Sequence, residues 1–290
     1  EKTRAVIKVQ DGCNQFCSYC AIPFARGRER SLNHEQVIQI AKDLCDKGHT
    51  EIVLTGIHTG RYDDGEYDLA KLMKALLENT PDSVYYRISS IEITEVSDAL
   101  IALMKENPRM CHHLHIPVQS ACNETLRRMN RPYTIEEFKE KIKYIRSCIP
   151  DISISTDVIA GFVQESDEEF ETTYENLAEL ELSFFHVFPY SKRNGTKAST
   201  LKGEINGKVA KARVARLLEL SNACRERDMK RFNPVQVLIE RKQDGYYTGY
   251  TNQYHSCKIL SDTPLSGRIT IEWDRIEDGT YYGKKDVVCD

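Results

Sequence analysis

The stretch Gly12-Cys13-Asn14-Gln15-Phe16-Cys17-Ser18-Tyr19-Cys20 places three cysteines in a C-x3-C-x2-C spacing near the start of the chain. An iron–sulfur cluster of four irons usually takes four thiolates. A loop that supplies only three leaves one iron open for a small ligand. We therefore expect Cys13, Cys17 and Cys20 to hold a [4Fe-4S] cluster that can do chemistry as well as carry electrons.

Two other sites could use these cysteines. A structural zinc site closes tetrahedrally with four ligands, and the next candidate, His34, lies in a helix-like stretch. A disulfide needs a partner and an oxidising compartment. The remaining cysteines are scattered singly, which is typical of free thiols in a reducing cytosol and indicates a cytoplasmic protein; they are Cys45, Cys111, Cys122, Cys148, Cys224, Cys257 and Cys289.

Strand and helix patterns alternate through the first two thirds of the chain. Apolar, β-branched strands are predicted at residues 5–9, 51–55, 85–89, 113–118, 152–159 and 184–188. Helices are predicted between them, at residues 32–47, 69–77, 98–105, 124–129, 135–148 and 168–180. Such alternation indicates an α/β fold with a parallel sheet. Six units fall short of the eight of a closed barrel, so we expect an open, partial parallel (β/α)6 barrel. Its site should lie at the carboxyl ends of the strands, where Cys13 follows the first strand.

The rhythm changes after residue 203. Residues 203–232 read as one long helix, and Pro234 marks a boundary. Residues 235–290 have no helical period and carry turn pairs such as Asp244-Gly245 and Asp278-Gly279, so we expect a small antiparallel all-β barrel. The predicted domains are therefore residues 1–232, a core with a C-terminal linker helix, and residues 235–290, the barrel.

Composition narrows the class of protein. The chain is 40% hydrophobic and 29% charged, which is ordinary for a soluble domain. No apolar run approaches the roughly 18–20 residues of a membrane span, so no membrane partner is expected. The net charge of −4 means that any contact with RNA must be local.

The cysteine spacing, with Tyr19 before the last cysteine, resembles the radical S-adenosylmethionine enzymes. Residues 21–31, AIPFARGRERS, resemble the methylthiotransferases within them, and above all the subfamily that methylthiolates threonylcarbamoyladenosine beside the tRNA anticodon. Residues 249–254, GYTNQY, resemble the TRAM module, which is similar to OB-folds. The resemblance implies a transferase that inserts a methylthio group at C2 of that nucleoside. Its cofactors would be a [4Fe-4S] cluster and S-adenosylmethionine, and its partners the tRNA anticodon stem-loop and an electron donor such as flavodoxin or ferredoxin.

The resemblance also implies which residues hold the cofactor. They lie in the cluster loop and after the second and fourth strands: Tyr19, Thr55, Gly56, Gln119, Ser120 and Arg131. Asp157, which closes the fifth strand, is a further candidate, because a buried aspartate needs a hydrogen-bond partner such as the substrate or a ribose. Two stretches depart from the family pattern, because Ala121-Cys122 and Val163-Gln164 stand where the family has glycines. Losing glycine removes backbone freedom beside the expected site.

For the substrate, three arginines directly after the cluster loop could grip phosphate, and a tyrosine in the TRAM-like segment could stack on a base. The candidates for RNA binding are Arg26, Arg28, Arg30, Arg193 and Tyr250. Residues 235–290 carry seven Lys/Arg against nine Asp/Glu, a net of −2, which is unusual for a tRNA-binding barrel.

Two alternative functions stay open from the sequence. A sister subfamily methylthiolates an aspartate on a ribosomal protein, and a non-catalytic RNA-binding protein with a structural metal is also possible. The family has a further N-terminal domain whose three cysteines hold a second [4Fe-4S] cluster. No second trio occurs in this chain, so we expect that cluster only in a domain missing from it, and we expect the chain to be the fragment that binds the radical S-adenosylmethionine cluster.

Overall fold

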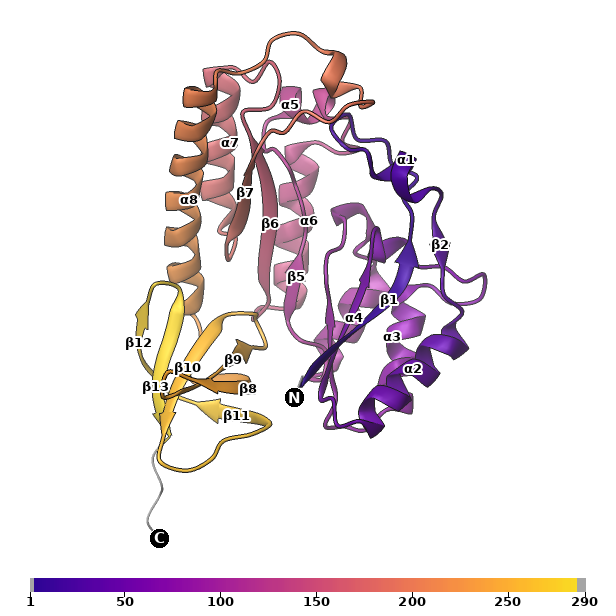
Figure 1. Cartoon of the computed structure of the whole chain (residues 1–290), viewed down its shortest axis with the longest axis vertical. Helices are drawn as coiled ribbons and strands as arrows, with labels where there is room; N and C mark the ends of the chain where they lie inside the picture. The colour runs from indigo at the N-terminus through magenta and orange to yellow at the C-terminus, as the bar shows by residue number, and fades with distance from the viewer. Residues whose placement is uncertain (1–2, 286–290) are drawn as a thin grey trace.

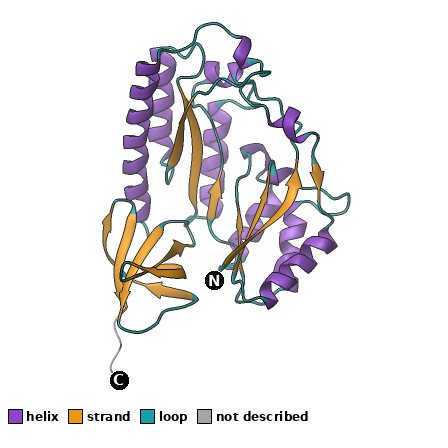
Figure 2. Cartoon of the chain, in the orientation of Figure 1, coloured by secondary structure: helices purple, strands orange, loops and turns teal. Residues whose placement is uncertain are grey.

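The computed structural model describes residues 3–285 (Figure 1). Helices and strands alternate through most of the chain and give way to strands alone at the end (Figure 2). The strands of the alternating part are β1 (Arg4–Asp11), β2 (Arg30–Ser31), β3 (Glu51–Gly56), β4 (Tyr85–Ile88), β5 (His113–His115), β6 (Ser153–Ala160) and β7 (Phe185–Pro189). Its helices are α1 (Ile22–Arg26), α2 (His34–Asp46), α3 (Leu69–Asn79), α4 (Asp98–Glu106), α5 (Asn123–Arg128), α6 (Ile135–Cys148), α7 (Asp167–Leu180) and α8 (Gly207–Met229). Cys289 lies outside the described residues.

Six of these strands run parallel, as the sequence predicts. Together with the antiparallel strand β2, they form two sheets, in the orders β2-β1-β3-β4 and β5-β6-β7. The sheets meet where the Cys111 N–H donates to the Tyr86 carbonyl at 2.8 Å, between β4 and the start of β5. The helices pack outside this curved wall, and one continuous apolar core joins them to it (Figure 1). The partial parallel (β/α)6 barrel is therefore confirmed.

Local chemistry explains where these helices begin. Six of them start at a side chain that accepts a hydrogen bond from a backbone N–H of the first turn, namely Asn33, Asp68, Ser97, Thr134, Ser166 and Asn206. Such caps satisfy donors that have no partner within the helix. The predicted helix starts agree with the structure to within two residues, with one exception. Helix α8 begins at Gly207, after the cap Asn206, and not at residue 203.

The C-terminal segment is all-β. It comprises β8 (Val235–Gln243), β9 (Tyr246–Thr251), β10 (Ser256–Ser261), β11 (Arg268–Ile271), β12 (Trp273–Glu277) and β13 (Thr280–Lys285). The sheet order is β11-β8-β9-β10-β13-β12. The prediction of a wholly antiparallel barrel is wrong in one place, because β10 and β13 pair in parallel. Residues 262–279 form the crossover that a parallel pair requires.

Two further elements differ from the prediction. β5 ends at His115 and not at residue 118, because Pro117 has no N–H to donate to a ladder. The chain rejoins the sheet at Gln119, which bridges to Val158. The short helix α1 and strand β2, which pairs antiparallel with the end of β1, had no sequence pattern long enough to predict them.

A buried charge network joins the all-β segment to the amino-terminal ends of the barrel strands. Glu51, which is 0% exposed, receives guanidinium groups from Arg4, Arg87 and Arg268, the last of them on β11. Arg87 also donates to the carbonyl oxygens of residues 251 and 252, both at 3.1 Å. These contacts fix the small sheet against the end of the barrel opposite to the cysteine loop.

Candidate functional site

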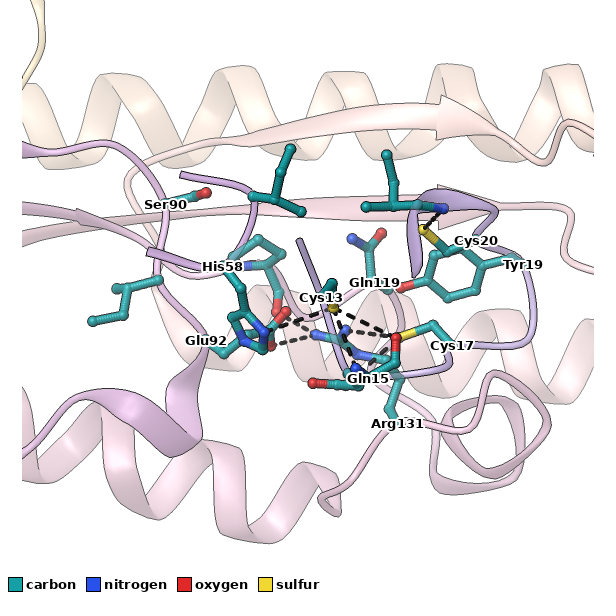
Figure 3. Close-up of a pocket in the computed structure, with 14 residues that line it drawn as sticks. Cys13, Gln15, Cys17, Tyr19, Cys20, His58, Ser90, Glu92, Gln119 and Arg131 are labelled. Carbon is teal, nitrogen blue, oxygen red and sulfur yellow. Dashed lines mark hydrogen bonds and ion pairs between the residues drawn. The ribbon is translucent and has the colours of Figure 1, made fainter. Parts of the chain in front are cut away.

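The three cysteines line one cavity at the carboxyl ends of the parallel strands (Figure 3). The cavity has a volume of about 180 Å³. It is also lined by Gln15 and Tyr19 from the cysteine loop, His58 after β3, Glu92 after β4, and Gln119 and Arg131 from the region after β5. We call it the cysteine cavity. The position matches the expectation that chemistry gathers at strand ends in this kind of barrel.

Hydrogen bonds from distant elements hold the cysteine loop in place. The Ser18 N–H donates to the Met129 carbonyl at 2.9 Å, and its hydroxyl donates to the Arg128 carbonyl at 2.6 Å. Asn130 Nδ2 donates to the Phe16 carbonyl at 2.8 Å. The loop is therefore docked on the end of α5, and its shape does not depend on a bound group alone.

Gly12 fixes the first turn of the loop. Its φ of +78° is left-handed, and a Cβ there would lie 2.0 Å from the carbonyl oxygen of Arg28. We predict that Gly12→Ala unfolds the loop locally and lowers the iron bound after reconstitution severalfold, since strain of about 1–3 kcal/mol adds to the clash. Gly65→Ala is the matched control, because Gly65 has a φ of +95° with no atom within 4 Å. Equal iron content in the two variants would contradict this role for Gly12.

Two positively charged side chains face the cysteine sulfurs. His58 Nδ1 lies 3.7 Å from Cys13 Sγ, and Arg131 Nη1 donates to Cys17 Sγ at 3.5 Å (Figure 3). Glu95 pairs with His58 Nε2 at 2.5 Å, and Glu92 accepts from Arg131 Nη2 at 2.7 Å. Both acids come from the single segment that follows β4. That segment therefore orients two N–H donors toward two of the three sulfurs.

Burial and these contacts oppose each other at His58. Burial disfavours a charged imidazole, but the hydrogen bonds to Cys13 and Glu95 outweigh it and raise the pKa of His58 to about 10. Its backbone N–H donates to Gln10 Oε1 at 2.7 Å, so the residue is held from both ends. An N–H donor beside a thiolate stabilises negative charge on sulfur.

The three cysteine sulfurs do not converge as the ligands of a single zinc ion would. Zinc holds thiolates at about 2.3 Å, which places tetrahedral sulfurs roughly 3.8 Å apart. Cys13, Cys17 and Cys20 are not among the groups of described residues whose potential ligand atoms all lie within 4.8 Å of one another. The donor set of three thiols with N–H groups behind them therefore suits a [4Fe-4S] cluster.

The other predicted cofactor residues divide into two groups. Tyr19, Gln119 and Arg131 line the cysteine cavity. Arg131 is almost fully enclosed, and besides Cys17 and Glu92 its guanidinium contacts Tyr133 and the Pro117 carbonyl. Its donors are therefore largely engaged within the protein.

Four predicted residues do not line that cavity: Thr55, Gly56, Ser120 and Asp157. A Cβ on Gly56 would lie 2.8 Å from the Gln10 side chain. The group that approaches the Gly56 backbone closely is therefore a side chain of the protein itself. Ser120 is buried and lies 3.2 Å from the Thr173 hydroxyl. Asp157 lies on β6 and pairs with His115 Nε2 at 2.9 Å. Ile57 and His58, directly after Gly56, reach the cavity instead.

Of the residues predicted to contact RNA, the four arginines are exposed and the tyrosine is half-buried. Arg26, Arg28, Arg30 and Arg193 are exposed. Arg26 and Arg30 share Asp11, at 3.4 and 3.1 Å. Loop 191–197, which carries Arg193, is tied to the cysteine loop because the Ala198 N–H donates to the Ser18 carbonyl at 2.7 Å. Tyr250 is half-buried and stacks on Tyr254 with ring centroids 4.8 Å apart, at the junction with the barrel.

The histidines and cysteines around β5 contact several different side chains. Cys111 contacts Glu51, and His113 Nε2 lies 2.9 Å from the Ser155 hydroxyl. Within residues 3–285, the one group of three potential ligands with atoms within 4.8 Å is His115, Asp157 and His186. Two of them, His115 and Asp157, contact each other. No helix among the described residues combines the length and the apolar character needed to cross a bilayer.

Comparison with known proteins gives a consistent result. Residues 7–177 match the family described as the Radical SAM superfamily. The chain is 38% identical over 278 residues to the threonylcarbamoyladenosine tRNA methylthiotransferase MtaB of Bacillus subtilis, covering 93% of this chain and 62% of that protein. It is 34% identical over 287 residues to the protein of the same name from Chlamydia pneumoniae, covering 98% of this chain and 68% of that protein.

Other relatives carry a different name. The chain is 36% identical over 262 residues to the tRNA-2-methylthio-N(6)-dimethylallyladenosine synthase of Thermodesulfovibrio yellowstonii, covering 89% of this chain and 61% of that protein. Among solved structures, coproporphyrinogen III oxidase (HemN) from Escherichia coli superposes with a TM-score of 0.53 at 15% identity, covering 79% of this chain and 53% of that one. That likeness shows the fold alone. The chain spans about six tenths of the length of the curated relatives that it matches first.

Proposed function

Because this chain belongs to the radical SAM superfamily, and within it to the family of the tRNA methylthiotransferases, we propose that it serves the methylthiolation of tRNA. The specific proposal is insertion of a methylthio group at C2 of N6-threonylcarbamoyladenosine beside the anticodon. The observation that carries it is the set of three, and only three, cysteines around one cavity at the strand ends of a partial barrel. Relatives named for threonylcarbamoyladenosine support the choice of nucleoside.

The cysteine cavity suits the cofactors of this chemistry. A [4Fe-4S] cluster with three protein thiolates, when bound, supplies an open iron for S-adenosylmethionine and the electron that cleaves it. Cys13, Cys17 and Cys20 would hold the cluster, and His58 and Arg131 would donate to two of the thiolates. An electron donor of the flavodoxin or ferredoxin kind would serve as the reductant.

Apolar packing beside the cluster loop would keep water away from the reaction. Tyr19 packs edge-on against Phe162, with centroids 6.3 Å apart, and Met129 and Val163 complete the cluster of buried side chains there. Tyr19 and Gln119 line the cysteine cavity, and we expect them to contact S-adenosylmethionine there. A closed, dry site protects a reactive species from solvent.

The substrate proposal rests on where the free cations lie. Arg28 and Arg193 are exposed, and both belong to segments that adjoin the cysteine loop. Arginine binds phosphate through paired N–H groups, so these residues suit the backbone of an RNA loop held over the cavity. The net charge of −4 makes such local contacts the more important. A tRNA substrate would place the protein in the cytoplasm.

His58 offers a test of the cluster environment. We predict that His58→Leu lowers the midpoint potential of the cluster, because N–H donors to sulfur favour the reduced, more negative cluster. We expect the rate of S-adenosylmethionine cleavage to fall roughly 10-fold or more at a fixed reductant concentration. The measurement is a potentiometric titration followed by electron paramagnetic resonance at equal iron content. His58→Gln, which keeps an N–H donor, should shift the potential less, and identical potentials in all three proteins would refute the role.

Binding distinguishes tRNA from a ribosomal-protein substrate. A fluorescent anticodon stem-loop that carries threonylcarbamoyladenosine is titrated with the reconstituted chain, and a peptide with an aspartate-bearing loop serves as competitor. We expect the stem-loop to bind and the peptide not to displace it. Arg28→Glu combined with Arg193→Glu should weaken binding and reduce its dependence on salt. Binding of the peptide in preference to the stem-loop would contradict the proposal.

A further inference from the structure

A second cavity lies inside the barrel and is not used by the chemistry above. It has a volume of about 230 Å³. Its polar lining consists mainly of Arg4, Arg87, His113, His115, His186 and Tyr254. We call it the lumen chamber. No carboxylate is among its lining residues, and its side chains come mainly from β1, β3, β4, β5 and β7, with Tyr254 from the all-β segment.

The chamber adjoins the cysteine cavity along two segments of the barrel. Ser89 lines the chamber and Ser90 the cysteine cavity, on the segment that follows β4. On β5, His115 lines the chamber, and Pro117, two residues later, lines the cysteine cavity. Two residues of extended chain span roughly 7 Å. The end of the chamber at Ser89 and His115 therefore adjoins the cysteine cavity, whereas Arg4 and Arg87 lie toward the opposite end of the barrel.

The chamber adjoins an excess of positive charge. Arg4, Arg87 and Arg268 find two carboxylates between them within the described residues, Glu51 and Glu240. The three guanidinium groups lower the pKa of the Glu51 carboxyl to about 2 although its burial acts in the other direction, so Glu51 counts as one full negative charge. One positive charge is left over. A buried charge without a counterion is costly.

Several polar atoms of these same side chains have no partner. Arg4 Nη2, Arg87 Nε and His113 Nδ1 are buried and make no hydrogen bond with any described residue. Arg87 and His113 are 4% exposed each. Most buried polar groups in proteins are paired, so three orphaned atoms on three chamber residues indicate a missing partner.

The nearest acid does not supply that partner. The Asp157 carboxylate pairs with His115 Nε2 at 2.9 Å, while His115 Nδ1 lies 2.7 Å from the Ser155 hydroxyl. Ser155 in turn lies 2.9 Å from His113 Nε2. The Asp157 carboxylate therefore contacts His115, at one end of a series of contacts that runs through Ser155 to His113. Burial and the neighbouring Arg87 lower the pKa of His113, which leaves it neutral in a region of positive potential.

We propose that the lumen chamber binds the carboxylate of the threonylcarbamoyl group of the substrate nucleoside, an inference that rests on the proposed function. The urea on N6 carries the threonyl group across the edge of the adenine that includes N1 and C2. A base held with C2 toward the cysteine cavity therefore carries its carboxylate within reach of the chamber. A cationic chamber selects this anionic substituent over an uncharged one, such as the dimethylallyl group.

The test compares three anticodon stem-loops by fluorescence anisotropy with the reconstituted chain. One carries threonylcarbamoyladenosine, the second its uncharged methyl ester, and the third unmodified adenosine. We expect the acid to bind at least roughly 10-fold more tightly than the ester, as for loss of a charged hydrogen bond. Equal binding of acid and ester would overturn the chamber assignment and leave the tRNA function standing. Failure of all three to bind would overturn both.

A pair of variants at one position separates charge from shape. His186 is exposed on β7 and lines the chamber, so it can be replaced without disturbing the Glu51 network. His186→Glu places a negative charge there and should abolish most of the preference for the acid over the ester. His186→Gln should retain that preference. An unchanged preference in correctly folded His186→Glu, checked by its melting temperature, would also overturn the proposal.

Discussion

We expect Cys17→Ala to abolish both the cluster and the cleavage of S-adenosylmethionine. The variant leaves two thiolates for a cluster that needs three from this loop. It also removes the sulfur that accepts hydrogen bonds from both Gln15 and Arg131. After anaerobic reconstitution we expect iron content and the brown absorbance near ~400 nm to fall to background. Formation of 5′-deoxyadenosine should fall by orders of magnitude.

The control for this variant is Cys45→Ala. Cys45 is a free, half-buried cysteine on α2, far along the chain from the loop. Its removal tests whether the loss of any thiol affects reconstitution. We expect the wild-type amount of iron and of 5′-deoxyadenosine in Cys45→Ala. Retention of a catalytically active cluster in Cys17→Ala would show that the three-cysteine site is assigned wrongly.

Glu51→Ala causes the largest loss of stability that we expect from a single change away from the cysteines. It leaves Arg4, Arg87 and Arg268 facing one another without the carboxylate that they share. Breaking a buried ion pair from one side typically costs about 3–5 kcal/mol. We expect a fall of that size in the free energy of unfolding by urea. Glu240→Gln, which removes an acid that is 27% exposed, should cost less than about 1 kcal/mol.

The same network gives a dependence on pH. The pKa of Glu51 is about 2 in the folded protein, below its ordinary value of 4.5. A depressed carboxyl pKa stabilises the fold fully above 4.5, and that contribution is lost as the pH falls from 4.5 toward 2. Urea unfolding of wild type and Glu51→Gln across this range should show their difference in stability shrinking as the pH falls. A constant difference would contradict the assignment.

The parts of the fold that could be predicted are those determined by short stretches of sequence. Caps such as Asn33 and Ser166 begin helices, and apolar β-branched runs mark strands, so the order of elements followed from the chain itself. The cysteine loop was predictable because its three ligands lie within eight residues. The parallel pairing of β10 with β13 was not, because a crossover has no signature in the strands that it joins.

The surroundings of the cysteines could not be predicted, because they too depend on which strands are neighbours in the sheet. His58 and Glu95 meet at Cys13 only because β1, β3 and β4 are neighbours in one sheet. Gly56 was expected to be among the residues that hold the cofactor. The Gln10 side chain of β1 occupies the space beside it and accepts a hydrogen bond from the His58 N–H after β3. The one usable signal was the position of His58, two residues past the end of a strand at the functional edge of the barrel.

Arg131 illustrates the difference between position and role. The sequence placed it near the cofactor, and the structure brings it to the cysteine cavity. Its contacts with Cys17, Glu92 and Tyr133 give it a role toward the cluster sulfur that its sequence neighbours do not reveal. Tyr250, singled out for stacking on RNA, lies half-buried against Tyr254 where the two parts of the chain meet.

The central claim is that Cys13, Cys17 and Cys20 hold a cluster that cleaves S-adenosylmethionine. The most direct measurement is the yield of 5′-deoxyadenosine after anaerobic reconstitution with iron and sulfide, followed by S-adenosylmethionine and dithionite, with iron and zinc quantified in the same sample. We predict about four irons per chain and 5′-deoxyadenosine that depends on dithionite. One tightly bound zinc per chain, no iron and no 5′-deoxyadenosine would contradict the account.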